Sequence, residues 1–184
     1  LAITFTNKAA REIKERLAKA LDDATAADAV WAGTFHSVCI RILRSHIGLL
    51  GYKSGFSIYD TDDQKKLIVR CMKDLNLDDK KFPPKSMLNL IGRAKDKLMT
   101  PADMQAENTA DYLWSVAAKV YAHYQEELAR ANALDFDDII MLTVRLLEEN
   151  PDILDYYQHK FKYVCVDEYQ DTNFAQFRLT ELLA

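Results

Sequence analysis

The sequence predicts a mostly helical α/β chain in which short parallel strands near both ends are separated by a long helical segment. Short apolar runs occupy residues 1–5, 29–34 and 162–166; runs of this length bounded by polar residues are typical of buried parallel strands. About 125 residues separate the second run from the third, too many for a plain crossover and too periodic for a loop. We therefore expect a helical subdomain, residues 36–159, inserted into an α/β domain. That domain would consist of residues 1–35 and 160–184.

The first helix is expected directly after the first strand. Thr6 or Asn7 can cap it, and its apolar positions recur every fourth residue, so they share one face. These positions are Ile13, Leu17 and Leu21. A second helix should run from Phe35 to about Ile47, before three glycines loosen the chain.

Cap and break signals divide the middle of the chain into further helices. Ser, Thr or Asp at the N-cap and Pro in the first turn are typical helix starts. The signals are, in order, Thr61 with Gln64, Pro84, Thr100 with Pro101, Thr109, and Asp135 with the apolar pair Leu134 and Ile139. Pro151 then interrupts the last of these helices.

Composition and cysteine usage restrict the class of protein. The chain has 184 residues, of which 49% are hydrophobic, enough for one core and a small second one. No window approaches the ~18 uninterrupted apolar residues of a membrane span. Cys39, Cys71 and Cys165 are far apart and lack the spacing of zinc ligands. These features predict reduced thiols in an intracellular, cytoplasmic protein with no zinc site.

Charge is distributed unevenly along the chain. The formal net charge is −4, yet residues 7–21 carry five Lys or Arg against two Glu, and residues 80–97 carry six against one Asp. Basic segments of this kind supply phosphate contacts in proteins that bind nucleic acid. The alternative for most of these lysines is a solvated helix face.

The pair Asp167 and Glu168 is the most informative feature of the sequence, because it follows directly on the last apolar run. In open α/β sheets, ligands bind beyond the carboxyl ends of the strands. An Asp there suits Mg²⁺, which prefers oxygen ligands and keeps several waters. The Glu, pointing the other way along the strand, could orient or deprotonate a water. A solvated acidic turn would give the same bare pair by chance.

The longer string that contains this pair, residues 167–173 (DEYQDTN), resembles motif II of the UvrD/Rep/PcrA helicases, superfamily 1 DNA translocases with 3′→5′ polarity. Three further segments resemble motifs of this family, and all four stand in the family's order. They are residues 1–12 (LAITFTNKAARE) for motif Ia, 33–37 (GTFHS) for motif Ib, and 134–138 (LDFDD) for the segment that precedes motif II. Together they frame essentially the whole chain.

The resemblance implies a partial RecA-like P-loop domain whose helical insertion lies over a track of single-stranded DNA. It implies an ATP-dependent DNA helicase with ATP and Mg²⁺ as cofactors, acting on single-stranded DNA and single-strand/double-strand junctions. Asp167 and Glu168 would be catalytic, Asp167 as the metal ligand and Glu168 as the base, and Gln170 would contact the nucleotide. The pathway (repair, replication restart or conjugation) stays open.

Motif position also suggests which residues contact DNA. Proteins hold single strands by stacking bases on aromatic rings beside a basic groove. Phe5, at the end of a strand, and Phe136, on the first turn of a helix, are the candidates for stacking; the alternative for each is a place in the core. Lys8 lies beside a helix N-terminus, which favours anions. Other donors in the same groove would be Thr4, Thr6, Asn7, Thr34 and His36, of which Asn7 and Thr34 can equally serve only as caps.

A phosphate-binding P-loop is missing from the sequence. That loop requires Gly-x-x-x-x-Gly-Lys-Ser/Thr, and none of the five glycines is followed by Lys. The chain begins with Leu inside a predicted strand and ends soon after motif II. We therefore expect a fragment of the first motor domain that does not hydrolyse ATP by itself. The alternatives are a homologue that binds DNA or a partner without hydrolysing ATP, and a helical interaction module.

Overall fold

The computed structural model describes residues 1–21, 29–107 and 111–184, and it is mostly helical with short parallel strands. Three strands form one parallel sheet in the order β2-β1-β5. They are β1 (Ala2–Thr4), β2 (Ala32–Thr34) and β5 (Cys165–Val166). Ile3 of β1 pairs with Gly33 on one side and with Val166 on the other. The central strand therefore joins segments from both ends of the sequence.

The three predicted strands are present but shorter than expected. The second begins at Ala32 because Ala29 is helical and Val30 lies in a bend, and the third has only two residues. A second parallel pair, β3 (Ser57–Ile58) with β4 (Ala133–Leu134), was not predicted. Runs of two residues carry too little periodicity to be recognised from sequence.

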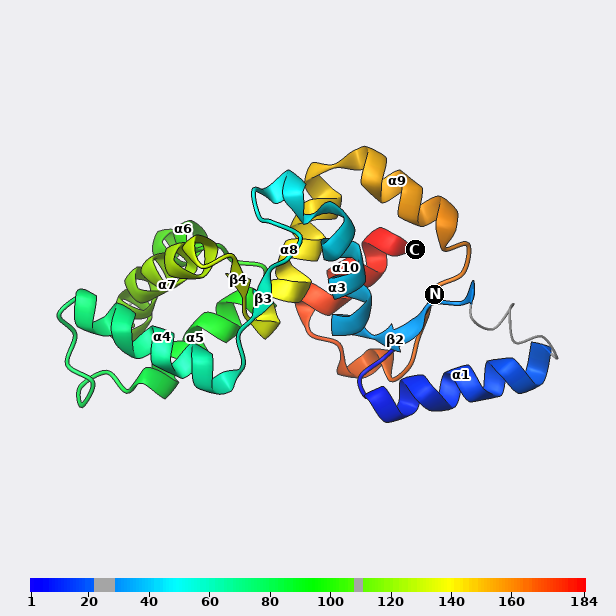
Figure 1. The fold of residues 1–184 in the computed structure, drawn as a ribbon. Coiled ribbons are helices and arrows are strands. Elements are labelled where there is room, and N and C mark those ends of the chain that lie inside the picture. Colours follow the sequence, from blue (N-terminus) through cyan, green and yellow to red (C-terminus); the bar gives the residue numbers. More distant parts are fainter. Residues whose placement is uncertain (22–28, 108–110) are drawn as a thin grey trace.

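Five helices lie around the three-stranded sheet, and four of them share one hydrophobic core with it (Figure 1). They are α1 (Asn7–Leu21), α3 (Phe35–His46), α8 (Phe136–Glu149), α9 (Pro151–Lys160) and α10 (Phe174–Leu183), with short 3-10 turns η1 (Ile47–Leu50) and η2 (Tyr169–Asp171). Ile3 of β1 is fully buried in this core together with Ile42 of α3 and Leu146 of α8. Helix α1 contacts β1 and β2 but stays outside this core, since Ile13 and Leu17 are only half-buried and Leu21 is exposed.

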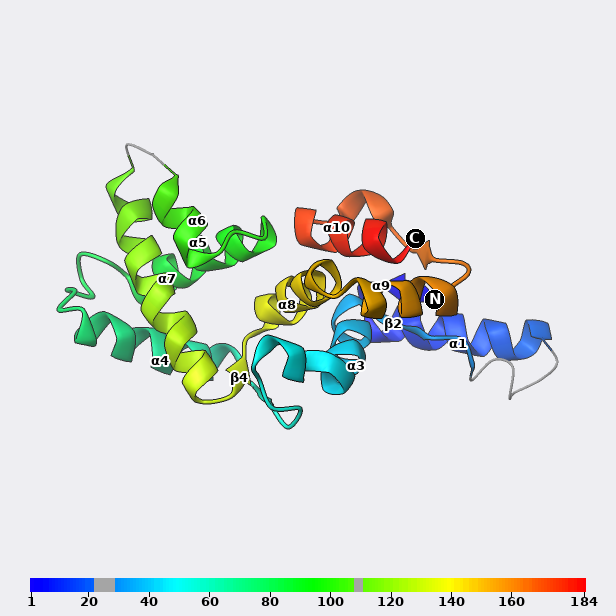
Figure 2. The same cartoon turned by 90° about the horizontal axis from the view of Figure 1, so that it is seen from above.

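Four other helices form a second hydrophobic core of their own. They are α4 (Thr61–Asp74), α5 (Pro84–Asp96), α6 (Pro101–Ala106) and α7 (Tyr112–Arg130). Figures 1 and 2 show this group to one side of the sheet, with α8 between the two parts. The chain enters the group through β3 and leaves it through β4, so the β3-β4 pair closes the base of the group.

Helix starts agree with the sequence in most places. Thr100 and Asp135 are N-caps as predicted, and each also forms a capping box that was not predicted, with Asp103 and with Asp138. The prediction for α4 was wrong by one residue: Asp60, not Thr61, is the N-cap, and its carboxylate accepts from two backbone amides. Both residue types are good caps, so the choice falls to backbone geometry, which sequence does not specify. The predicted start at Thr109 lies outside the described residues.

Candidate functional site

Asp167 lies at the carboxyl ends of the two strands β1 and β5. Its backbone amide donates to the carbonyl of Ile3 at 2.9 Å, which fixes the residue directly after β5. The hydroxyl of Thr4, a buried residue, lies 3.4 Å from Asp167 Oδ2. The Asp167 side chain is itself exposed. An accessible carboxylate at this end of a parallel sheet is where a metal-bound ligand would be reached.

Glu168 has a left-handed backbone, with φ of 50°. Non-glycine residues rarely adopt this conformation, and such residues are concentrated at functional sites. We expected Glu168 to point oppositely to Asp167 along the strand, but the strand ends at Val166 and Glu168 has a left-handed backbone, so strand alternation does not apply to it. The Glu168 carboxylate is exposed and accepts a hydrogen bond from the Gln170 amide, which brings two of the predicted site residues together.

Aromatic rings from three separate segments meet at the carboxyl end of β1. The Phe5 ring lies 5.4 Å from the ring of Phe35, and the His36 ring lies 5.9 Å edge-on from the ring of Phe136. Phe35 is 1% exposed, whereas Phe5 and Phe136 are 37% and 46% exposed. Phe35 therefore belongs to the core, and the Phe5 ring packs against it. Phe5 and Phe136 keep accessible ring surface on which a planar base could stack.

His36 is held between these rings and the start of α8. Burial lowers the pKa of His36, and a hydrogen bond to the Phe136 backbone only partly opposes this effect. The imidazole is therefore neutral near pH 7 and can both donate and accept hydrogen bonds.

The predicted polar contacts divide into caps and accessible groups. Thr34 is the N-cap of α3, and its hydroxyl accepts from the amide of Ser37. Thr6 accepts from the amide of Ala9 at 3.1 Å, which resolves the choice of cap for α1 in favour of Thr6. Asn7 and Lys8 are exposed on the first turn of α1. An exposed lysine beside free helical amides forms a surface suited to phosphate.

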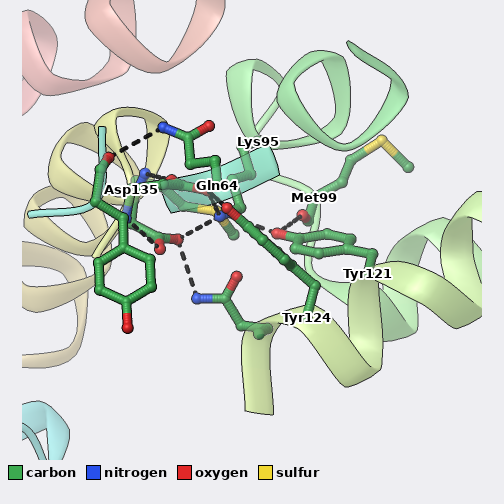
Figure 3. Close-up of polar contacts among 10 residues, drawn as sticks. Gln64, Lys95, Met99, Tyr121, Tyr124 and Asp135 are labelled. Carbon is green, nitrogen blue, oxygen red and sulfur yellow. Dashed lines mark hydrogen bonds and ion pairs between the residues drawn. The ribbon is translucent and has the colours of Figure 1, made fainter. Parts of the chain in front are cut away.

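A buried ionic cluster lies directly behind Phe136, and sequence reasoning missed it. Lys95 Nζ donates to Asp135 Oδ2 at 2.7 Å and to Asp138 Oδ1 at 2.8 Å, and these three side chains are at most 4% exposed (Figure 3). The hydroxyl of Tyr124 donates to the same Asp135 oxygen at 3.1 Å. The basic segment at residues 80–97 thus contains one lysine that is neutralised internally and cannot contact DNA. The signal in the sequence is that Met87, Ile91 and Lys95 recur at every fourth position, which places the lysine on the buried face of α5.

Burial strongly perturbs the titration of the cluster. Burial alone would lower the pKa of Lys95, but Asp135 and Asp138 outweigh it and raise the pKa, so the ammonium stays charged. Burial, reinforced by the Asp135 carboxylate, raises the pKa of Asp138 to about 6 and that of the neighbouring Asp137 to about 7. Lys95 cannot neutralise three neighbouring carboxylates. Its ion pairs are with Asp135 and Asp138, and among the described residues Asp137 forms no ion pair.

Metal and membrane features can be stated for the described part of the chain. No three His, Cys, Asp or Glu side chains there are grouped to hold a metal ion. Mg²⁺ usually binds one or two carboxylates together with phosphate oxygens and waters, so a single accessible Asp167 fits an ion carried in by a nucleotide. None of the helices in residues 1–21, 29–107 and 111–184 is long and apolar enough to cross a membrane.

Comparison with known proteins gives a consistent family. The profile of the UvrD/REP helicase N-terminal domain matches residues 1–184. The chain is 52% identical over 184 residues to the ATP-dependent DNA helicase PcrA of Staphylococcus aureus (strain Mu50), and 49% identical to the PcrA of Bacillus subtilis (strain 168). All of this chain is aligned in both comparisons, but it spans only 25% and 24% of the length of those relatives. The chain belongs to the UvrD/REP helicase N-terminal domain family.

Proposed function

We propose that this chain works as part of a longer ATP-dependent DNA helicase with 3′→5′ polarity, which we call the parent protein. The proposal rests on the family and on one geometric observation: Asp167 and Glu168 stand at the same end of the sheet as the accessible rings beside His36. An ATP-driven translocase needs both a hydrolysis site and a grip on the strand. Such an arrangement lets one small sheet serve both.

In this proposal, Asp167 holds Mg²⁺ together with the phosphates of ATP, and Thr4 positions its carboxylate. Bound Mg-ATP supplies the scissile phosphoanhydride and the charge neutralisation that phosphoryl transfer requires. Glu168 accepts the proton of the attacking water, and the Gln170 amide beside it contacts the nucleotide. The chain by itself should not hydrolyse ATP, because none of its glycines is followed by the lysine of a P-loop.

For DNA, we propose that Phe5 and Phe136 stack bases while Lys8 contacts a phosphate. The side chains of Thr6, Asn7, Thr34 and His36 would add hydrogen bonds along the same strand, whereas the buried Thr4 is assigned to Asp167 instead. The exposure of both phenylalanines supports this, since a core residue would be covered as Phe35 is. We propose single strands and single-strand/double-strand junctions as the substrates, and the name DNA helicase that the PcrA relatives carry supports DNA as the substrate.

We further infer that the sheet belongs to a partial RecA-like domain and that the helices of the second core are an inserted subdomain. The separation of the two hydrophobic cores supports this division. It favours narrower bounds for the insertion than residues 36–159, because α3, α8 and α9 share the core of the sheet. The segment from β3 to β4 then carries the insertion.

The test is a pair of substitutions in the parent protein. Glu168→Gln keeps the shape of the side chain but removes the base, so ATP turnover stimulated by single-stranded DNA should fall by ~10²–10⁴-fold. Binding of ATP and of DNA should survive. Asp167→Asn should instead weaken Mg²⁺-dependent nucleotide binding. Glu126→Gln, an exposed site on α7, is the matched control and should behave as the wild type.

The outcomes separate the alternatives. Identical phenotypes for the two substitutions would contradict the assignment of metal ligand and base. A parent protein that binds DNA but turns over no ATP would be a non-hydrolysing homologue. One that binds neither would be an interaction module.

A further inference from the structure

The C-terminal end of α5 contacts both halves of the proposed site through two consecutive residues. Lys95 makes its two charged hydrogen bonds to Asp135 and Asp138, which are the cap and first turn of α8 and flank Phe136 in sequence (Figure 3). The next residue, Asp96, faces another segment: its Oδ1 accepts from Asn173 Nδ2 at 2.6 Å. Asn173 ends the DEYQDTN string that begins at Asp167.

Asn173 uses both ends of its carboxamide. Its Oδ1 accepts from the amide of Gln176 at 2.9 Å and so caps α10, while its Nδ2 donates to Asp96. The orientation of the amide is therefore fixed by two partners. The segment between Asp167 and Asn173 contains only the short turn η2, so both of its ends are held, one by the sheet and the other by Asp96.

We propose that Asp96 and Asn173 are positioning residues through which single-stranded DNA at Phe136 controls the motif II segment, residues 167–173. This inference rests on the proposed function. It assigns to the second group of helices a role beyond contact with DNA. Helix α5 would transmit a shift of α8, caused by bound single-stranded DNA, to the segment that contacts the nucleotide.

The connection is stiff at its first step. The two bonds of Lys95 are charge-assisted and buried, so breaking either would leave an uncompensated charge in the interior. The backbone of α5 also lies close to the Asp137 side chain on the first turn of α8, because a Cβ built on Gly92 would lie only 3.1 Å from Asp137 Oδ2. When a base stacks on Phe136 and shifts the first turn of α8, the end of α5 must follow. Through its hydrogen bond with Asp96, Asn173 would then move as well.

A reversal of polarity tests this connection in the parent protein. Asn173→Asp keeps the oxygen that caps α10 but replaces the donor with a carboxylate facing Asp96, so the contact becomes repulsive. Asp96→Asn restores a donor opposite it. The readouts are ATP turnover without DNA, ATP turnover with saturating oligothymidylate, the affinity for that oligonucleotide, and the melting temperature.

We expect Asn173→Asp to reduce the stimulation of ATP turnover by DNA roughly 5- to 50-fold, within the range of couplings between hydrogen-bonded neighbours. Turnover without DNA and the affinity for DNA should each stay within about twofold of the wild type, less than the ~1.4 kcal/mol that a tenfold change represents. The double variant Asp96→Asn with Asn173→Asp should recover most of the stimulation. Asn89→Asp adds the same charge at an exposed site on α5 and should change nothing.

Three results would overturn the inference. The first is undiminished stimulation of ATP turnover by DNA in Asn173→Asp. The second is a double variant that does not recover this stimulation although its melting temperature is normal. Equal loss of turnover with and without DNA would likewise show that Asn173 acts on hydrolysis alone. A wild-type parent protein that DNA does not stimulate would contradict the proposed function itself, which is a separate outcome.

Discussion

Phe136→Ala gives a direct test of whether the accessible rings bind DNA or fill the core. Phe136 is 46% exposed, and its ring lies edge-on to His36, so truncation removes only part of a buried side chain. Full burial makes Phe→Ala cost ~3–5 kcal/mol of folding stability. With about half of the ring already in water, we expect a cost of about 1–2 kcal/mol for Phe136, scaled down from that range.

Phe136→Ala should also weaken the affinity for single-stranded DNA. Loss of one stacked base contact costs ~1–3 kcal/mol, which corresponds to roughly a 5- to 150-fold weaker affinity. The affinity can be measured on this chain by fluorescence anisotropy with a labelled oligothymidylate, and the folding stability by urea unfolding followed by circular dichroism. Phe5→Ala should behave in the same way, since Phe5 is 37% exposed beside Phe35.

Two controls bracket this result. Phe35→Ala removes a ring that is 1% exposed and should cost the full ~3–5 kcal/mol of stability. Tyr163→Ala removes an 82% exposed ring next to the amino end of the sheet, where the Leu1 amine donates to its carbonyl, and should alter neither quantity. A large loss of stability in Phe136→Ala with unchanged DNA affinity would refute the argument and assign the ring to the core.

Three further predictions concern charge. Lys8→Ala should weaken binding of any single strand and reduce the slope of log affinity against log salt by about 0.7, the loss of one phosphate contact. Lys95→Met leaves Asp135 and Asp138 buried without a cation and should cost ~3–5 kcal/mol in urea unfolding, and an unchanged stability would contradict this prediction. Burial raises the pKa of Asp137 from 3.8 to about 7; the folded state therefore keeps a proton that the unfolded state releases, and stability should fall as pH rises between these values. Asp137→Asn should flatten that dependence, and an unchanged pH profile would contradict it.

Local chemistry explains what the sequence predicted well. Helix-start signals depend on residues a few positions apart, so the caps Thr100 and Asp135 were recognised without knowledge of the fold, although their capping-box partners Asp103 and Asp138 were not. The strands were recognised because apolar runs ending in polar residues are short-range patterns too. We expected the separated runs to share one sheet, but the order β2-β1-β5 was not predicted.

Boundaries between the two cores were harder to predict. Helices α3, α8 and α9 have the same amphipathic periodicity as α4 to α7, so sequence alone cannot say which core each apolar face contacts. The pairing of β3 with β4 was missed because strands of two residues carry too little periodicity to be recognised from the sequence. It joins residues about 76 apart with only two residues on each side.

Lys95 shows why charge counts along a sequence mislead at such a boundary. Within residues 80–97 it adds to a net positive segment, which favours an exposed basic surface. Its position four residues after Ile91 places it on the buried face instead, and a buried lysine requires carboxylates nearby. Asp135 was already recognised as the cap of α8, so its charge seemed accounted for, and Asp138 forms a capping box with it. Yet a capping carboxylate retains lone pairs after it binds backbone amides. The same two side chains can therefore start α8, neutralise Lys95 and fix α5 beneath Phe136, and these combined roles make the position of that ring depend on the helical group.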